Sequence, residues 1–259
     1  MVSQDASARR TRPARHPTRP AAHNRLLAAF PRQDLAGLAD QFEEVRLVRG
    51  QILFEPGQVP PHVHFPHAGT IISLVLPLRD GGTTETVTVG LEGAVGLGVD
   101  AADAAVEAYT RGVVQMPGAA ARILTTSLAR AAAASPALRQ LLARHAEAAM
   151  SMALQTAACN AQHPLRARLA RWLLTAQDRS GDAAAPLPLT QEVLAEMLSV
   201  RRASVGEVAL ALQAEGLVRL SRGGVRVLDR AGLEGAACEC HAALRCRYGR
   251  LLPGPEAGR

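Results

Sequence analysis

Lysine is missing from this sequence, and aromatic residues are few. All 29 basic residues are arginine, and the 259 residues include only 4 Phe, 2 Tyr and 1 Trp. Because 48% of the residues are nevertheless apolar, a wholly disordered or collagen-like chain is excluded. No segment approaches the roughly 18 consecutive apolar residues that a membrane-spanning helix needs, so we expect no membrane span.

Cysteine is also scarce, and no secretory signal is visible. The chain has 4 Cys without a paired framework, which is typical of a protein kept in a reducing compartment. The arginine-rich start is followed by Pro and His rather than by the apolar stretch of a signal peptide. We therefore expect a cytoplasmic protein with two domains, since the length suffices for two cores.

Positive charge is concentrated at the start of the chain. The formal net charge is +6, and residues 1–23 hold five Arg against Asp5 alone. All the other residues together therefore carry a net charge of only +2. With almost no apolar residue to bury, residues 1–23 are expected to form a disordered, solvated tail. The alternative is a basic arm that touches DNA.

The first half of the chain predicts a β-sheet domain. After a helical pattern over residues 24–42, the apolar period changes to that of strands. Short runs separated by Gly, Pro and Asp predict an antiparallel β-roll or jelly roll over residues 24–127. These runs are 45–49, 51–55, 62–66, 70–76, 83–89 and 108–116.

Residues 119–160 are rich in alanine and predict helix. Ser135 followed by Pro136 is a favourable helix start. The apolar stripe after it has nearly heptad spacing, which fits either a dimer seam or packing against the β-roll. We assign residues 128–160 to a dimerisation helix. The stripe consists of Leu138, Leu141, Leu142, His145, Ala148, Ala149 and Met152.

Residues 161–233 predict a winged helix-turn-helix. Thr190 is a suitable N-cap for one short helix, and a second helix covers residues 202–214, with Gly216 placed to end it. The strands of a hairpin follow, and glycines stand in its turn. In this arrangement the second helix enters the major groove and its first residues lie nearest the bases. The other elements are a helix at 165–177, a linker at 181–188 and strands at 217–220 and 225–228.

The residue types around these elements suit DNA. An arginine at the start of the second helix can contact guanine O6 and N7 with two hydrogen bonds, and arginines on the wing can neutralise phosphates. Thr190 and the free N–H groups beside it can hold a phosphate. The alternative is a helical hairpin that serves as an interaction module. The predicted DNA-binding residues are Thr190, Gln191, Arg201, Arg202, Ser204, Glu207, Arg219, Arg222 and Arg226.

Three stretches resemble the DNA-binding domain of the Crp/Fnr transcription regulators. They are Leu-Thr-Gln-Glu at 189–192, Ser-Val-Arg-Arg-Ala-Ser-Val at 199–205 and Gly-Leu-Val at 216–218. The upstream roll and long helix are similar to the effector domain and dimerisation helix of that family, so the resemblance covers residues 24–235. It implies that Arg202 contacts a base, while Thr190, Arg201 and Ser204 contact phosphates.

Two residues depart from the family pattern. Ser199 stands in the turn where the family often has Gly, so a positive φ there would be strained. Glu207 stands where some members have a second base-reading Arg. It could accept a hydrogen bond from cytosine N4 or repel phosphates, so the target sequence does not follow from the resemblance.

The β-roll lacks the signatures of two sensing modes that the family uses. The stretch 89–97 has the glycines of a phosphate-binding turn, but Asp100, Asp103 and Glu107 come before the next cation, Arg111. This acidic run would repel the phosphate of a cyclic nucleotide. No Cys precedes Cys159, which argues against the N-terminal iron–sulfur cluster of some members. We expect no cofactor, and the signal stays open.

Two groups of metal-binding residue types occur, and neither predicts a site. His62 and His64 share a strand face, as they would in a metal-dependent cupin-like enzyme, but the Glu that a cupin needs nearby is missing. We expect solvent-facing histidines there, His67 included. On one straight helix over 231–252 the three cysteines would point in different directions. They are Cys238, Cys240 and Cys246.

The sequence therefore predicts an α+β fold with an N-terminal β-roll, a long dimerisation helix and a C-terminal winged helix-turn-helix. Residues 234–259 complete the chain as a helix and tail. The predicted protein is a homodimeric transcription regulator and not an enzyme. Its expected partners are double-stranded DNA, a second copy of itself and RNA polymerase. The alternatives are a metal-dependent cupin-like enzyme and a regulator whose roll binds no ligand.

Overall fold

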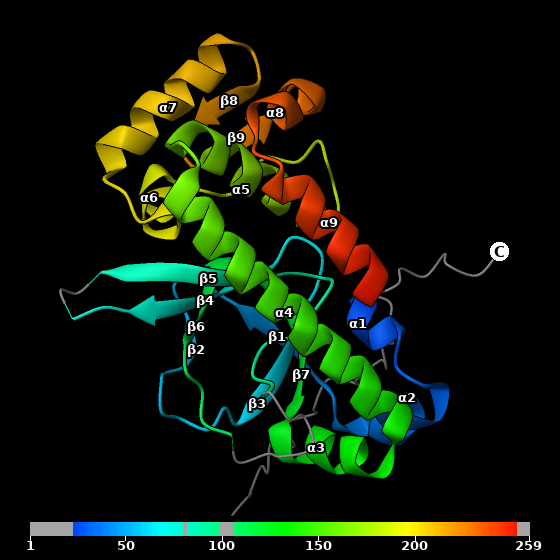
Figure 1. Ribbon diagram of the computed structural model, residues 1–259. Helices are drawn as coiled ribbons and strands as arrows, with labels where there is room; N and C mark the ends of the chain where they lie inside the picture. Colours follow the sequence, from blue (N-terminus) through cyan, green and yellow to red (C-terminus); the bar gives the residue numbers. More distant parts are fainter. Residues whose placement is uncertain (1–22, 80–81, 99–105, 253–259) are drawn as a thin grey trace, which may run out of the picture.

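The computed structural model describes residues 23–79, 82–98 and 106–252. Figure 1 shows three parts: a β-roll, the long helix α4 that lies across it, and a smaller helical domain beyond one end of that helix. The predicted α+β architecture is confirmed. Residues 1–22 of the predicted tail over 1–23, the aspartates at 100 and 103, and residues 253–259 lie outside the described residues. None of the described helices is long and apolar enough to cross a membrane.

The β-roll consists of two antiparallel sheets. One has the strand order β1-β7-β3 and the other β2-β6-β4-β5. Between the sheets, Leu47 and Ala120 of the first pack with Ile72 and Val114 of the second in one buried apolar cluster. Phe65 of the first sheet is fully buried in a separate cluster with the neighbouring helices. The elements are α1 Arg25–Ala28, α2 Arg32–Leu38, the 3-10 turn Ala39–Gln41, β1 Glu43–Leu47, β2 Ile52–Phe54, β3 His62–Pro66, β4 Ile71–Pro77, β5 Thr83–Val89, β6 Arg111–Met116 and β7 Gly118–Leu124.

The prediction of helix over residues 119–160 is wrong at its start. Residues 118–124 form β7, which pairs with both β1 and β3. Ala120 and Ala121 are fully buried in this central strand, so tertiary pairing overrides the helix propensity of an alanine run. Helix α3 follows as Thr125–Ala134, and α4 as Pro136–Gln162. As predicted, Ser135 caps α4 by accepting a hydrogen bond from the Leu138 amide at 3.3 Å.

The apolar stripe of α4 packs against the β-roll of its own chain. Leu138, Leu141 and Leu142 enter the core that contains Phe65, and Met152 packs with the strands of the other sheet. His145 is buried in the same stripe, and its Nε2 lies 2.8 Å from the carbonyl oxygen of Ala94. Of the two alternatives left open for this stripe, packing against the roll is the one found.

The helical domain has the predicted order of helices and hairpin. Its core is built from apolar residues of every element, including Leu173, Leu194, Leu212 and Val225, all of which are buried. The wing hairpin pairs Val218 with Val227 at its base. The elements are α5 Leu165–Ser180, α6 Gln191–Leu198, α7 Arg202–Ala214, β8 Val218–Ser221, β9 Gly224–Val227 and α8 Arg230–Ala236.

The chain after the wing is not one straight helix. Helix α8 ends at Ala236, and the extended backbone of its C-cap Ala237 (φ −79°, ψ 160°) turns the chain before α9 begins at Cys240. Helix α9 covers Cys240–Leu251 and runs back alongside α4 toward α1 (Figure 1). The prediction of a single helix over 231–252 is therefore wrong. The break redirects both cysteines beside it.

Candidate nucleic-acid interface

The turn between α6 and α7 is strained as predicted. Ser199 has φ 52° and ψ 51°, and it is the one non-glycine residue with positive φ within the described ranges. The Ser199 hydroxyl lies 3.2 Å from Thr84 Oγ1 and donates to the Thr83 carbonyl oxygen at 3.5 Å. Both threonines belong to β5 of the roll. The turn that leads into α7 is thus attached to the other domain.

Thr190 and Gln191 serve mainly to build the two helices. The Thr190 hydroxyl caps α6 by accepting from the Val193 amide at 3.4 Å. The side chain of Gln191 lies against Gly206 of α7, where an added Cβ would be 3.4 Å from Gln191 Oε1. Both residues are half-buried. They hold the first turn of α6 against α7, and part of each side chain still reaches the surface.

Arg202 forms an ion pair that aligns the start of α7. Its Nε lies 2.9 Å from Glu192 Oε1, and the two side chains are 66% and 56% exposed. The backbone N–H and the Thr190 hydroxyl beside Glu192, together with Arg202, lower the pKa of this carboxyl. Arg201 is the N-cap of α7 and places no side-chain cap on it. The N–H groups of the first turn therefore have no side-chain cap, and they carry the positive end of the helix dipole.

The outer face of α7 is less polar than its start. Glu207 is exposed, Ser204 is half-buried, and Leu210 has 56% of its surface exposed. The Gln213 side chain accepts a hydrogen bond from the Leu220 amide at 2.7 Å, which attaches the end of α7 to the wing. The wing and α7 are therefore held together.

The wing presents three exposed arginines. Arg219 and Arg226 are direct partners in the β8–β9 register, and Arg222 lies in the turn between the strands. Two like charges opposite each other in a hairpin are unfavourable unless an anion lies between or beside them. This arrangement suits a phosphate group.

The prediction of solvent-facing histidines at positions 62, 64 and 67 is wrong for two of the three. His64 and His67 are buried, and His62 is half-buried. Burial, with His62 and Arg122 nearby, lowers the pKa of His64 to about 4. Burial also lowers the pKa of His67 to about 4. Arg122 stands opposite His64 in the β3–β7 register, and its guanidinium disfavours a metal cation beside these rings.

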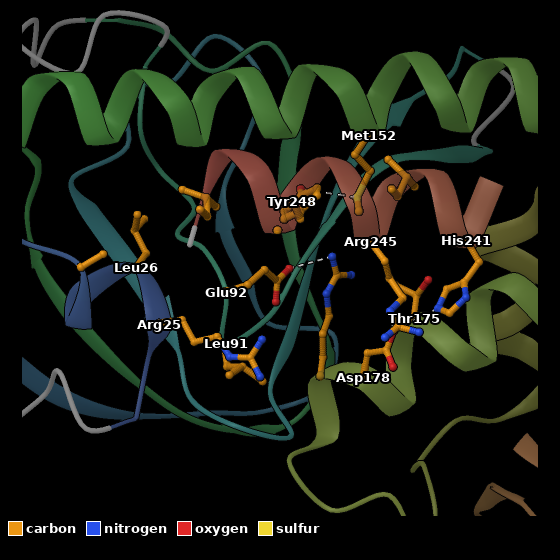
Figure 2. Close-up of a pocket in the computed structure, with 15 residues that line it drawn as sticks. Arg25, Leu26, Leu91, Glu92, Met152, Thr175, Asp178, His241, Arg245 and Tyr248 are labelled. Carbon is orange, nitrogen blue, oxygen red and sulfur yellow. Dashed lines mark hydrogen bonds and ion pairs between the residues drawn. The ribbon is translucent and has the colours of Figure 1, made fainter. Parts of the chain in front are cut away.

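A cavity of about 320 Å³ lies where the roll, α4, α5 and α9 meet (Figure 2). Arg179 of α5 reaches across it to Glu92 of the roll, and Nη2 lies 2.7 Å from Oε1. These side chains are only 7% and 15% exposed. On the other side, Asp178 Oδ2 lies 2.9 Å from His241 Nε2. The Arg179–Glu92 pair thus joins the helical domain to the roll, and the Asp178–His241 contact joins α5 to α9.

Four side chains at the end of α4 and the start of α9 come together, and we call them the cysteine–histidine cluster. Their ligand atoms all lie within 4.8 Å of one another. The cluster consists of Cys159, His163, Cys238 and Cys240. Cys246 is exposed and lies outside it. The sequence prediction of no metal ligands here rested on the straight helix that the structure does not have.

The sequence does carry a signal for two of the missed residues. Cys159 and His163 are four residues apart, a spacing that places both on one face of a helix. Because Pro164 follows His163, the sequence alone favours a helix-start role for this residue over a ligand role. The other half of the cluster depends on the break after Ala237, and the nearby Gly235, a residue of low helix propensity, is the local signal that could have indicated it.

Comparison with known proteins agrees with this geometry. Residues 167–236 match the family model of the Crp-like helix-turn-helix domain. No curated protein sequence matches the chain. The fold, in contrast, recurs in many solved structures.

Three of these structures illustrate the likeness. FixK2 from Bradyrhizobium japonicum has a TM-score of 0.66 and 14% identity, over 76% of this chain and 98% of FixK2. A putative transcriptional regulator of the Crp/Fnr family from Eubacterium rectale has a TM-score of 0.62 and 16% identity, over 82% of this chain and 96% of the regulator.

The third is CLP, the c-di-GMP responsive global regulator from Xanthomonas campestris. It has a TM-score of 0.57 and 18% identity, over 77% of this chain and all (100%) of CLP. The chain therefore has the fold of the Crp/Fnr transcription regulators, and its residues 167–236 are a Crp-like helix-turn-helix domain.

Proposed function

We propose that the protein is a homodimeric, sequence-specific DNA-binding transcription regulator. The observation that carries the proposal is the exposed arginine surface around the start of α7. Arg201 and Arg202 lie at that start, and three more arginines lie on the attached wing. Only Glu192 and Glu207 oppose them among the site residues discussed above. This surface suits a major groove flanked by phosphates.

Arg202 is the proposed base-reading residue. Its ion pair with Glu192 is exposed, so DNA can replace the carboxylate at little cost. Before binding, the same pair keeps the guanidinium beside the helix start. Guanine O6 and N7 would then accept two hydrogen bonds from it. Glu207, one to two turns further along α7, would accept a hydrogen bond from cytosine N4.

The remaining site residues would fix the position of α7 on the backbone of the DNA. Arg201 and Ser204 lie beside the uncapped N–H groups of α7, and such groups bind phosphate oxygens. Thr190 and Gln191 would contribute at the start of α6. The arginines of the wing would neutralise phosphates on the neighbouring groove. They are Arg219, Arg222 and Arg226.

A second stripe on α4 is the proposed dimer contact. The predicted stripe is buried in its own chain, but the opposite face leaves Met150 and Leu154 with 58% and 66% of their surfaces exposed. Ala157 and Ala161 continue this face at spacings of three and four, which is the spacing of a two-helix seam. Ala143 lies seven residues before Met150 on the same face, with Glu147 between them. A dimer along α4 would present two helix-turn-helix domains to a pseudo-palindromic site.

The roll is proposed to sense a signal other than a cyclic nucleotide. The turn over residues 90–93 carries Glu92, whose carboxylate already pairs with Arg179 of α5. The arginine that stands nearest this turn is thus used inside the protein. Among the described residues Arg25 also lies beside this turn, but the Glu92 carboxylate would repel the phosphate that a cyclic nucleotide brings. RNA polymerase is proposed as the further partner through which bound dimers act.

Genome-wide capture of bound fragments, followed by competition titrations, tests the function. The wild-type chain should select one pseudo-palindromic sequence that outcompetes bulk carrier DNA. R202A should lose about 1–3 kcal/mol of binding and relax the preference at one base pair of each half-site. R130A, which removes an exposed arginine of α3, is the matched control and should bind like the wild type. Equal weakening of R202A on all sequences would contradict the base-reading role.

A further inference from the structure

The cysteine–histidine cluster has the dimensions of a coordination site. Cys159 Sγ lies 3.5 Å from Cys238 Sγ, and Cys240 Sγ lies 3.6 Å from His163 Nδ1. In a tetrahedral site with metal–sulfur bonds of about 2.3 Å, neighbouring ligand atoms are about 3.7 Å apart. The four ligand atoms approach one another within 4.8 Å, which leaves room for one ion and not for a cluster of several irons with bridging sulfides.

The fold brings the four ligands together from two distant segments. Cys159 lies in the last turns of α4, and His163 caps that helix directly before Pro164 and α5. Cys240 is the first residue of α9, and Cys238 lies two residues before it. Cys159, Cys238 and Cys240 are buried, and His163 is half-buried. An ion held by all four side chains would therefore join the α4–α5 junction to the start of α9.

We propose that the cysteine–histidine cluster binds one zinc ion. Three sulfurs and one imidazole nitrogen are a ligand set that zinc takes in structural sites. All four coordination positions are supplied by the protein and the sulfurs are buried, so no position is left for a substrate or a water. The site is structural rather than catalytic.

Neighbouring side chains complete the surroundings that such a site needs. Glu239 Oε1 lies 3.3 Å from His163 Nε2, so the ring can donate to this carboxylate while Nδ1 faces the metal. Gln155 donates from Nε2 to Cys240 Sγ at 3.0 Å. A zinc ion with three thiolates has a net charge of −1. Arg171 is buried nearby and interacts electrostatically with Cys159, and its Nε has no hydrogen-bond partner among the described residues.

Zinc would fix the angle between α4 and the helical domain. The chain passes from α4 to α5 at His163, and residues 163 and 164 have extended backbone angles. With zinc bound, this junction cannot change its geometry without moving α9, which packs along α4. The ion would therefore set the orientation of the helix-turn-helix relative to the roll, and its loss would weaken both stability and DNA binding.

Metal analysis of the full-length chain, purified under reducing conditions, tests the site. We expect about one zinc per chain in the wild type and in C246S, which removes the exposed cysteine. C159S and C238S should each fall several-fold in zinc content. Stoichiometric zinc that survives both substitutions would overturn the assignment, and so would a wild-type chain without zinc after growth in zinc-supplemented medium.

Two measurements on the wild type cover the case in which the variants fail to fold. Replacement of zinc by Co²⁺ should produce visible absorption of tetrahedral cobalt and a thiolate-to-cobalt charge-transfer band. A thiol reagent should modify Cys246 alone in the metal-loaded chain and all 4 cysteines after chelation. A disulfide between Cys159 and Cys238 in the freshly reduced and purified chain, or modification of all thiols before chelation, would refute the site. Neither readout depends on DNA binding.

Discussion

Arginine has opposite roles on the outer and inner sides of the helical domain. On the outer side Arg202 is 66% exposed and its carboxylate partner is 56% exposed. On the inner side Arg179 is 7% exposed and is paired with Glu92, which is 15% exposed. An exposed pair contributes little to stability and leaves the cation available to a ligand, whereas a buried pair becomes essential once formed. Burial, and not residue type, therefore separates the proposed DNA-binding surface from the structural junction.

The largest expected effect is on the inner side. E92Q leaves the guanidinium of Arg179 buried without a counter-charge, and this should lower the free energy of unfolding by about 3–5 kcal/mol. Urea denaturation followed by the fluorescence of Trp172 measures the change. E215Q is the matched control, because it removes the exposed pair with Arg166 and should cost less than about 1 kcal/mol. Similar losses of unfolding free energy in E92Q and E215Q would contradict the expected difference between the buried and the exposed ion pair.

The next largest expected effect is a pH dependence of the free energy of unfolding, which arises at the same junction. Glu85 of β5 accepts a hydrogen bond from Trp172 Nε1 at 2.9 Å, and burial raises its pKa from 4.5 to about 7. Because the folded-state pKa is the higher one, the protonated side chain is favoured by folding. The contribution of Glu85 to the free energy of unfolding is complete below pH 4.5 and is lost as the pH rises through 7.

Substitution of Glu85 sharpens this prediction. In E85Q the fall in unfolding free energy between pH 5 and pH 8 should be smaller than in the wild type by up to about 3 kcal/mol. Chemical denaturation across this pH range provides the measurement. E196Q, in which an exposed glutamate of α6 is replaced, should keep the wild-type profile. An unchanged profile in E85Q would show that Glu85 is already ionised in the folded protein.

On the outer side the effects should appear in binding rather than in stability. R226A removes one of the two opposed arginines of the wing, so it should weaken binding to all sequences alike. The slope of log affinity against log salt should shrink by roughly 1, as expected for one lost phosphate contact. Salt titrations with specific and random DNA test this. An effect confined to one base pair would instead assign base reading to Arg226.

The smallest expected effect lies where the two sides meet, at Ser199. S199G relieves the positive φ, which is worth about 1 kcal/mol, but it removes the hydroxyl that bonds to β5. The two terms nearly cancel, so the free energy of unfolding should change by less than about 1 kcal/mol. S199A keeps the strain and loses the hydroxyl, and it should be the less stable variant. The reverse order in thermal denaturation would mean that the backbone is unstrained there.

The outer side is also the one that the sequence describes well. Thr190, Gly216 and the glycines of the wing act within a few residues of themselves, so caps and turns are visible without the fold. The arginines around α7 follow from those local elements. The predicted strain at Ser199 was found for the same reason.

The inner side depends on contacts between distant segments, and there the sequence predicted less. Alanines 119–121 have helix propensity, yet they form a strand because two other strands pair with them. His64 and His67 became buried through the packing of the roll. The cysteine–histidine cluster required a break after Ala237 and the return of α9 along α4. No local pattern encodes where that return ends.

The hydrogen bonds of Ser199 to β5 have a consequence for the rate at which the protein would associate with the proposed DNA site. The helix-turn-helix domain is attached to the roll at the turn between α6 and α7, and again at the α4–α5 junction. It therefore does not tumble independently of the rest of the chain. In the proposed dimer, the two helix-turn-helix domains would approach the DNA duplex with the distance between them already set. Association would then be limited by diffusion and orientation of the whole particle, and little additional freedom would be lost upon contact.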